Sequence, residues 1–88
     1  MKTKNLIIIS SEEMGIFLGT YEKAPLWSKH DMLHSSKAYG FNTMIAAEYY
    51  VARTMPEVKE RVDFFEIPCY IDTVYVDVID IIKAGYKD

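Results

Sequence analysis

The sequence has only one cysteine, Cys69, among 88 residues. A single cysteine excludes an internal disulfide, and one cysteine with two histidines excludes a cysteine-rich zinc site. The four glycines match neither the dinucleotide-binding pattern nor the Walker pattern, which excludes nucleotide binding through those motifs. The single cysteine favours a reducing compartment. Because no catalytic motif is found, the sequence alone assigns no activity.

Long hydrophobic runs are also absent. The apolar run at residues 6–9 has four residues, whereas a signal peptide needs roughly 7–15. No stretch approaches the roughly 20 apolar residues of a membrane span. We therefore expect a cytoplasmic protein without a membrane partner.

What is present is a large supply of hydrophobic side chains. Hydrophobic residues make up 50% of the chain and aromatic residues 14%. This predicts one domain over residues 1–88 that folds around its own core without a metal, a cofactor or a disulfide.

The charge is mildly acidic and uneven. The net charge is −3 overall, but residues 41–88 carry nine acidic and five basic groups. Such a balance provides no attraction for nucleic acid. The acidic half either attracts a basic partner or is a solvated surface that confers solubility.

The N-terminal third reads as strands. Residues 5–10 and 15–21 are rich in β-formers and are separated by a polar tip, which predicts an antiparallel hairpin with Gly15 in the turn. Gly19 indicates a bulge or a close approach. After Pro25, residues 26–28 form a short edge strand or a loop, and residues 29–40 read as the longest irregular connection.

The remainder reads as helix, strand and helix. Asn42 or Thr43 caps a helix near residues 43–55, and Pro56 ends it or begins one further turn. A strand near residues 61–67 is closed by Pro68.

Residues 73–84 combine β-formers with an apolar stripe at helical spacing, and we favour helix. The prediction is an α+β fold in which a small antiparallel sheet of three to four strands carries both helices on one face.

Reactive side chains are few. His30 and His34 lie four residues apart with Asp31 between them, as a metal site on a helix would require, but no third ligand is evident and ordinary loop histidines explain them. Cys69 has only acidic side chains near it in the sequence, which favours a structural cysteine. We expect neither a catalytic nor a metal site.

The aromatic residues suggest two kinds of binding surface. Tyr49 and Tyr50 are adjacent in the predicted helix and must point to different sides, so one ring leaves the core and anchors an interface, unless loops cover both. Trp27 and Tyr39, with Lys29 and Lys37, are the residues that would stack on and neutralise a small nucleotide in an oligomer groove.

One resemblance bears on function. The hairpin residues 14–19, the segment 26–28 and Phe41 before a capped helix resemble small accessory proteins of T4-like tailed bacteriophages. That resemblance covers roughly the first half of the chain and transfers no functional residue. It implies a protein in the host cytoplasm that binds and inhibits or redirects a host protein, including a defence factor.

The sequence thus favours a non-enzymatic protein-interaction module, with self-association into a homo-oligomer as a further expectation. The alternative is a small-ligand binder that sequesters a nucleotide signal at an oligomer interface.

Overall fold

Strands form most of the framework. The computed structural model describes residues 2–30, 37–83 and 85, and within these ranges the fold is α+β with antiparallel strand pairing. The strands are β1 (Thr3–Ser11), β2 (Gly15–Tyr21), β3 (Ala24–Trp27), β4 (Lys37–Tyr39), β5 (Asp63–Tyr70) and β6 (Tyr75–Asp77). The helices are α1 (Met44–Thr54) and α2 (Val78–Lys83), with 3-10 turns η1 (Ser28–His30) and η2 (Pro56–Arg61).

The larger sheet has the order β3-β2-β1-β5. The predicted hairpin is confirmed: Ser11 pairs with Gly15, whose positive φ of 88° suits a turn glycine. The register of β2 on β3 shifts between Phe17 and Gly19, which confirms the bulge.

Strand β5 runs past the proline that was expected to close it. Asn5 of β1 pairs with Pro68, and the pairing continues to Thr3 and Tyr70. The prediction of a strand end at Pro68 was wrong because β5 lies at the edge of the sheet, where a missing N–H group is tolerated.

A second, two-stranded sheet pairs β4 with β6. Residues 37–39 were expected to be irregular and residues 75–77 to be helical, and both predictions were wrong. Ala38 and Val76 are partners in this ladder, so the β-formers of the C-terminal segment are used for pairing and the helix begins only at Val78. Residues 31–36 of the expected connection lie outside the described residues.

Phe41 joins the two sheets. The Ile7 N–H donates to the Phe41 carbonyl at 2.7 Å, and the Phe41 N–H donates to the Ile7 carbonyl at 2.9 Å. Gly40 lies so close to β1 that a Cβ atom there would be 2.6 Å from Leu6 Cδ1. The small sheet is therefore held against β1 at a point where only glycine fits.

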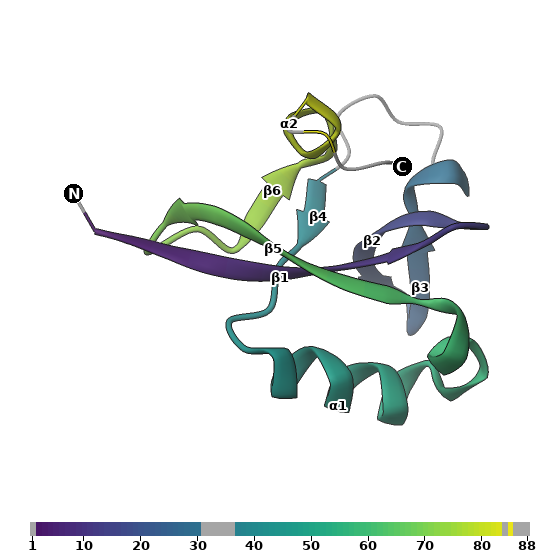
Figure 1. The fold of residues 1–88 in the computed structure, drawn as a ribbon. Coiled ribbons are helices and arrows are strands. Elements are labelled where there is room, and N and C mark those ends of the chain that lie inside the picture. Colours follow the sequence, from purple (N-terminus) through teal and green to yellow (C-terminus); the bar gives the residue numbers. More distant parts are fainter. Residues whose placement is uncertain (1, 31–36, 84, 86–88) are drawn as a thin grey trace.

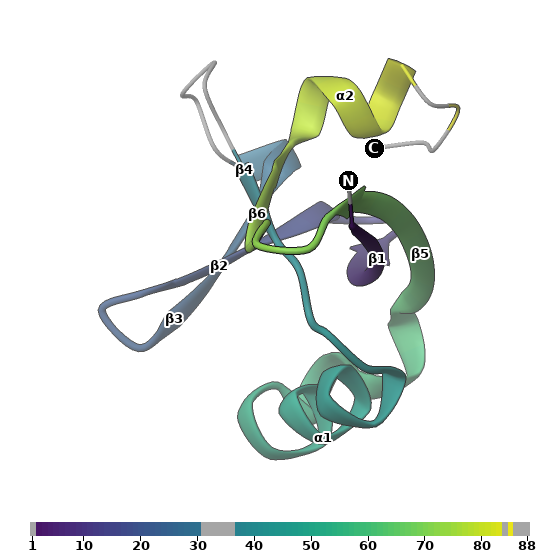
Figure 2. The same ribbon diagram turned by 90° about the vertical axis from the view of Figure 1, so that its left-hand side faces the viewer.

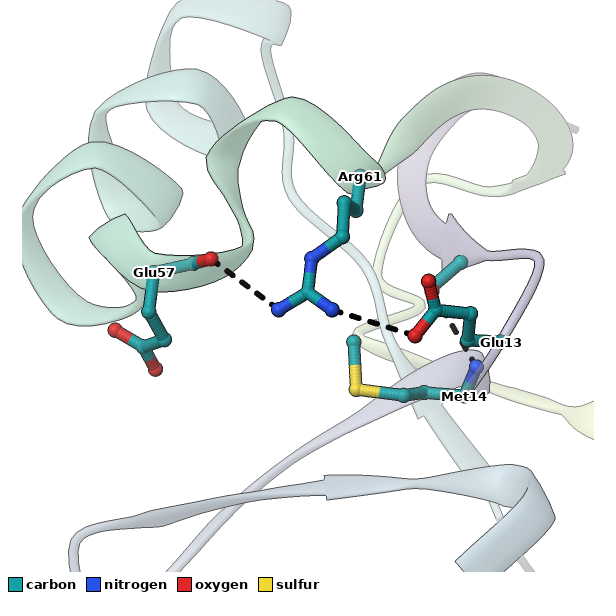
Figure 3. Close-up of polar contacts among 5 residues, drawn as sticks. Glu13, Met14, Glu57 and Arg61 are labelled. Carbon is teal, nitrogen blue, oxygen red and sulfur yellow. Dashed lines mark hydrogen bonds and ion pairs between the residues drawn. The ribbon is translucent and has the colours of Figure 1, made fainter.

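Helix α1 begins and ends where the sequence predicts. The Thr43 side chain accepts a hydrogen bond from the Ala46 N–H at 3.1 Å, and η2 begins at Pro56. Arg61, at the end of η2, donates to Glu13 Oε2 at 3.3 Å and to the Glu57 carbonyl at 3.3 Å (Figure 3). This side chain links η2 to the hairpin tip.

The two α-helices lie on opposite sides of β1 and β5, not on one face as predicted (Figures 1 and 2). The α1 face is formed by Ile7, Ile9, Phe17, Trp27, Phe41, Ala47, Val51, Met55 and Val58. The α2 face is formed by Ile8, Ile16, Leu18, Ala38, Ile67, Val78 and Ile81. The reason is visible in β1, where residues 6–9 are all buried although successive side chains point in opposite directions.

None of the helices in the described ranges is long and apolar enough to cross a membrane.

Candidate docking groove and aromatic cavity

Exposed hydrophobic side chains gather at the C-terminal end of the fold. Of the eleven large hydrophobic residues that are exposed in the described part of the chain, six lie between residues 70 and 82. These six are Tyr70, Ile71, Val74, Tyr75, Ile79 and Ile82. They come from the end of β5, the turn into β6, the first residue of β6 and helix α2, which follow one another along the chain.

A groove opens between β5, β6 and α2, and we call it the docking groove. Its volume is about 560 Å³, and apolar walls are provided by Ile67, Tyr70, Tyr75 and Ile81. Asp77 and Asp80 also line it. The Lys37 ammonium lies 4.0 Å from Asp77, a distance typical of a weak, solvent-screened ion pair.

The charged side chains that line this groove are mostly acidic. They are Asp77, Asp80 and Lys37, which together carry a net charge of −1. Because the two lining aspartates are exposed, their field extends into the solvent over the apolar floor.

A second hollow, the aromatic cavity, lies next to the groove. It has a volume of about 330 Å³ and is lined by Phe17, Thr20, Tyr39, Phe41, Tyr50 and Tyr75, among others. Five rings form a continuous series of contacts. The distances between ring centroids are 5.5 Å for Phe17 and Tyr50, 5.2 Å for Tyr50 and Phe41, 4.9 Å for Phe41 and Tyr39, and 5.5 Å for Tyr39 and Tyr75. Tyr75 lines both hollows, so they share a wall.

The hydroxyl groups of the cavity are close enough to influence one another. Partial burial raises the pKa of Tyr50 above its ordinary value of 10.0, a hydrogen bond with the Thr20 side chain opposes this rise, and the charge of Tyr39 adds to it. Tyr50 is therefore neutral at physiological pH.

The structure brings together some of the residues that the sequence singles out. Tyr39 and Tyr50 line the aromatic cavity, and Lys37 lines the adjoining groove. Tyr49 and Tyr50 point to different sides as predicted: Tyr49 is 61% exposed, whereas Tyr50 packs against the α1 face.

Trp27, Lys29 and Tyr49 do not join this site. Trp27 is 5% exposed and packs edge-on against Phe17, so its ring is out of reach of a surface ligand. Lys29 donates to the Glu12 carbonyl at 2.8 Å, and Tyr49 accepts from Arg53 at 2.6 Å on the outer side of α1.

Sequence reasoning counted Tyr70 and Tyr75 among the aromatic residues available to an interface but missed Asp77 and Asp80 as site residues. A continuous helix over residues 73–84 would place all the apolar residues at helical spacing in the core. Of these residues only Val78 and Ile81 are buried, whereas Val74, Tyr75 and Ile82 are exposed. The usable signal was the density of apolar residues interleaved with carboxylates, which exceeds what one short helix can bury.

The other candidates gain no support as sites. Cys69 is half-buried, forms no disulfide and lines the docking groove. Asp31 and His34 lie outside the described residues, so the metal hypothesis built on them with His30 stays untested. Among the described residues, no group of three or more His, Cys, Asp or Glu side chains is arranged to hold a metal ion.

No protein-family model, curated protein or solved structure matches this chain. The resemblance to phage accessory proteins therefore stays a prediction.

Proposed function

We propose that this protein is a non-enzymatic interaction module whose docking groove binds a basic, apolar segment of another protein. The observation that carries the proposal is the groove itself, whose apolar wall includes the exposed Tyr70 and Tyr75 and whose polar lining includes Asp77 and Asp80. Scattered surface hydrophobics are ordinary, but a contiguous patch with a polar rim is typical of an interaction site.

The charge of the groove selects the partner. Asp77 and Asp80 would repel an acidic segment, and Lys37, the one lysine among the described lining residues, is already beside Asp77. A segment that alternates lysine or arginine with aliphatic residues would fill the apolar floor and neutralise the rim. A host protein is the partner that the phage resemblance suggests.

The nucleotide alternative gains no specific support. The residues expected to stack on the base and to neutralise the phosphate do not meet in one place. Trp27 is buried, and Lys29 donates to the Glu12 carbonyl at the hairpin tip. Among the described residues that line the aromatic cavity, none is basic, so a phosphate would find no counter-charge there.

The test is a titration with a synthetic peptide that alternates leucine and lysine around one central arginine. We expect saturable binding by calorimetry, and no binding of the same peptide with glutamate in place of its basic residues. Asp80→Lys should weaken binding several-fold. Glu48→Lys is the matched control, because it makes the same charge change on the exposed side of α1.

Equal binding by wild type, Asp80→Lys and Glu48→Lys would refute the groove as the docking surface. Absence of binding to wild type would refute the proposed function itself.

A further inference from the structure

The walls of the aromatic cavity meet at steep angles. Tyr39 stands at 85° to Phe41 and at 69° to Tyr75, while Tyr50 is tilted by 48° from Phe41. Tyr39, Phe41, Tyr50 and Tyr75 all line the hollow, and because their planes differ they can offer both faces and edges to one small occupant. Aromatic rings arranged in this way are a recurrent binding site for organic cations.

The electrostatics of the cavity also select a cation. Each π-face carries partial negative charge, and the hydroxyl oxygens of Tyr39, Tyr50 and Thr20 can accept hydrogen bonds. The described lining residues include no charged side chain, so nothing on the wall repels a cation or attracts an anion.

The position of the cavity connects it with the docking groove. Tyr75 lines both, and it is 53% exposed, so a side chain from a segment in the groove can pass over its edge. The acidic groove attracts a basic segment. The cavity beside it can then hold a long cationic side chain of that same segment.

We infer that the aromatic cavity receives the guanidinium group of an arginine carried by the basic segment in the docking groove. This inference rests on the proposed function. The planar guanidinium stacks on rings and donates from five N–H groups, whereas a lysine ammonium is a compact, strongly hydrated charge that cannot stack. Arginine therefore uses both the ring faces and the hydroxyl oxygens.

The decisive experiment changes the peptide and leaves the protein intact. The alternating leucine and lysine peptide is compared with a version in which citrulline replaces its central arginine, which removes the charge and nearly preserves the shape. We expect the citrulline peptide to bind about tenfold more weakly, the size of a desolvated cation–π contact. The aromatic carbon and proton resonances of Tyr39 and Tyr50 should shift with the arginine peptide and return toward their free positions with citrulline.

Protein variants locate the effect. Tyr39→Leu should remove the preference for arginine over citrulline, and Tyr39→Phe should keep most of it because the ring remains. Tyr49→Leu is the control, since it deletes an exposed tyrosine ring on α1 that is not part of the cavity. If Tyr39→Leu is too unstable to measure, the binding of the arginine and citrulline peptides to Tyr39→Phe is compared instead. That comparison still separates the contribution of the tyrosine ring from that of the peptide's charge.

The failures can be distinguished. If both peptides bind equally and Asp80→Lys weakens both, the inference is overturned while the docking groove stands. If neither peptide binds, the proposed function fails, and N-acetylarginine amide at millimolar concentration then tests the cavity alone. Ring shifts with that free cation would support a cation site but refute its assignment to a partner's arginine, and no shifts would overturn the site.

Discussion

The two faces of the larger sheet are covered very differently. On the α1 face, an eleven-residue helix and η2 close over aromatic and aliphatic side chains, and Phe17 is fully buried at its centre. On the α2 face, the covering helix has six residues and leaves its own Ile79 and Ile82 exposed, and the exposed Tyr70 lines the groove beside it. The comparison teaches that the length of the covering helix decides how much apolar surface of each face is buried.

The largest expected effect is the loss of the Phe17 ring from the α1 face. Phe17→Ala should lower the free energy of unfolding by about 3–5 kcal/mol, because the ring is fully buried between Trp27 and Tyr50. Ile81→Ala on the α2 face is the paired variant, and about 2 kcal/mol is expected because the short helix can settle into the space. Urea unfolding of both variants checks the order, and a larger loss for Ile81→Ala would break the comparison.

The next effect concerns the junction between the sheets. Gly40→Ala should cost about 1–3 kcal/mol because the new methyl group would overlap the Leu6 side chain, including its Cβ atom at 2.9 Å. Unfolding monitored by circular dichroism measures the loss. Unchanged stability would show that β1 and the small sheet separate easily.

The cap of α1 should contribute less. Thr43→Ala removes the acceptor for the Ala46 N–H and should cost about 1 kcal/mol. Thr43→Ser keeps the oxygen and should restore most of the stability in the same unfolding assay. Equal losses for both variants would assign the effect to the methyl group and not to the cap.

A smaller effect is expected from pH. The pKa of Tyr50 is raised in the folded state, so folding favours the neutral phenol. The stability gained in this way is complete below the unfolded pKa of about 10 and is lost as the pH rises through the higher folded pKa. Urea midpoints at increasing alkaline pH should fall further for wild type than for Tyr50→Phe. Parallel curves would contradict the shift.

The smallest effect is expected at the outer side of α2. Ile79→Gln should change the free energy of unfolding by less than about 0.5 kcal/mol, because the side chain is already 61% exposed. Thermal unfolding is a sufficient measurement. A clear loss would mean that the α2 face is as closed as the α1 face.

Local signals predicted the fold well where partners are near in sequence. Gly15 marks the hairpin turn, Thr43 caps α1, and Pro56 begins η2, because each acts on atoms within a few residues. The β4 and β6 strands were missed because Ala38 pairs with Val76, and neither three-residue segment is recognisable without its distant partner.

The candidate site was only partly predictable for the same reason. Tyr39 and Tyr50 were identified from their residue type, but their meeting depends on Phe41 reaching β1. The groove requires β6 to be a strand, and the helical spacing of the C-terminal segment concealed this. The uninterrupted apolar run at residues 6–9 was the one sequence signal that both sheet faces are covered.

The pairing of β1 with β5 has a kinetic consequence. Asn5 donates to Glu66 across 61 residues of chain, and the whole ladder between these strands is equally long-range. A large loop must close before this ladder gains any stability, so the protein should fold more slowly than a helical bundle of the same length. In a growing polypeptide, β1 emerges long before β5, so the edge of β1 that β5 will cover stays available to other strands until β5 arrives.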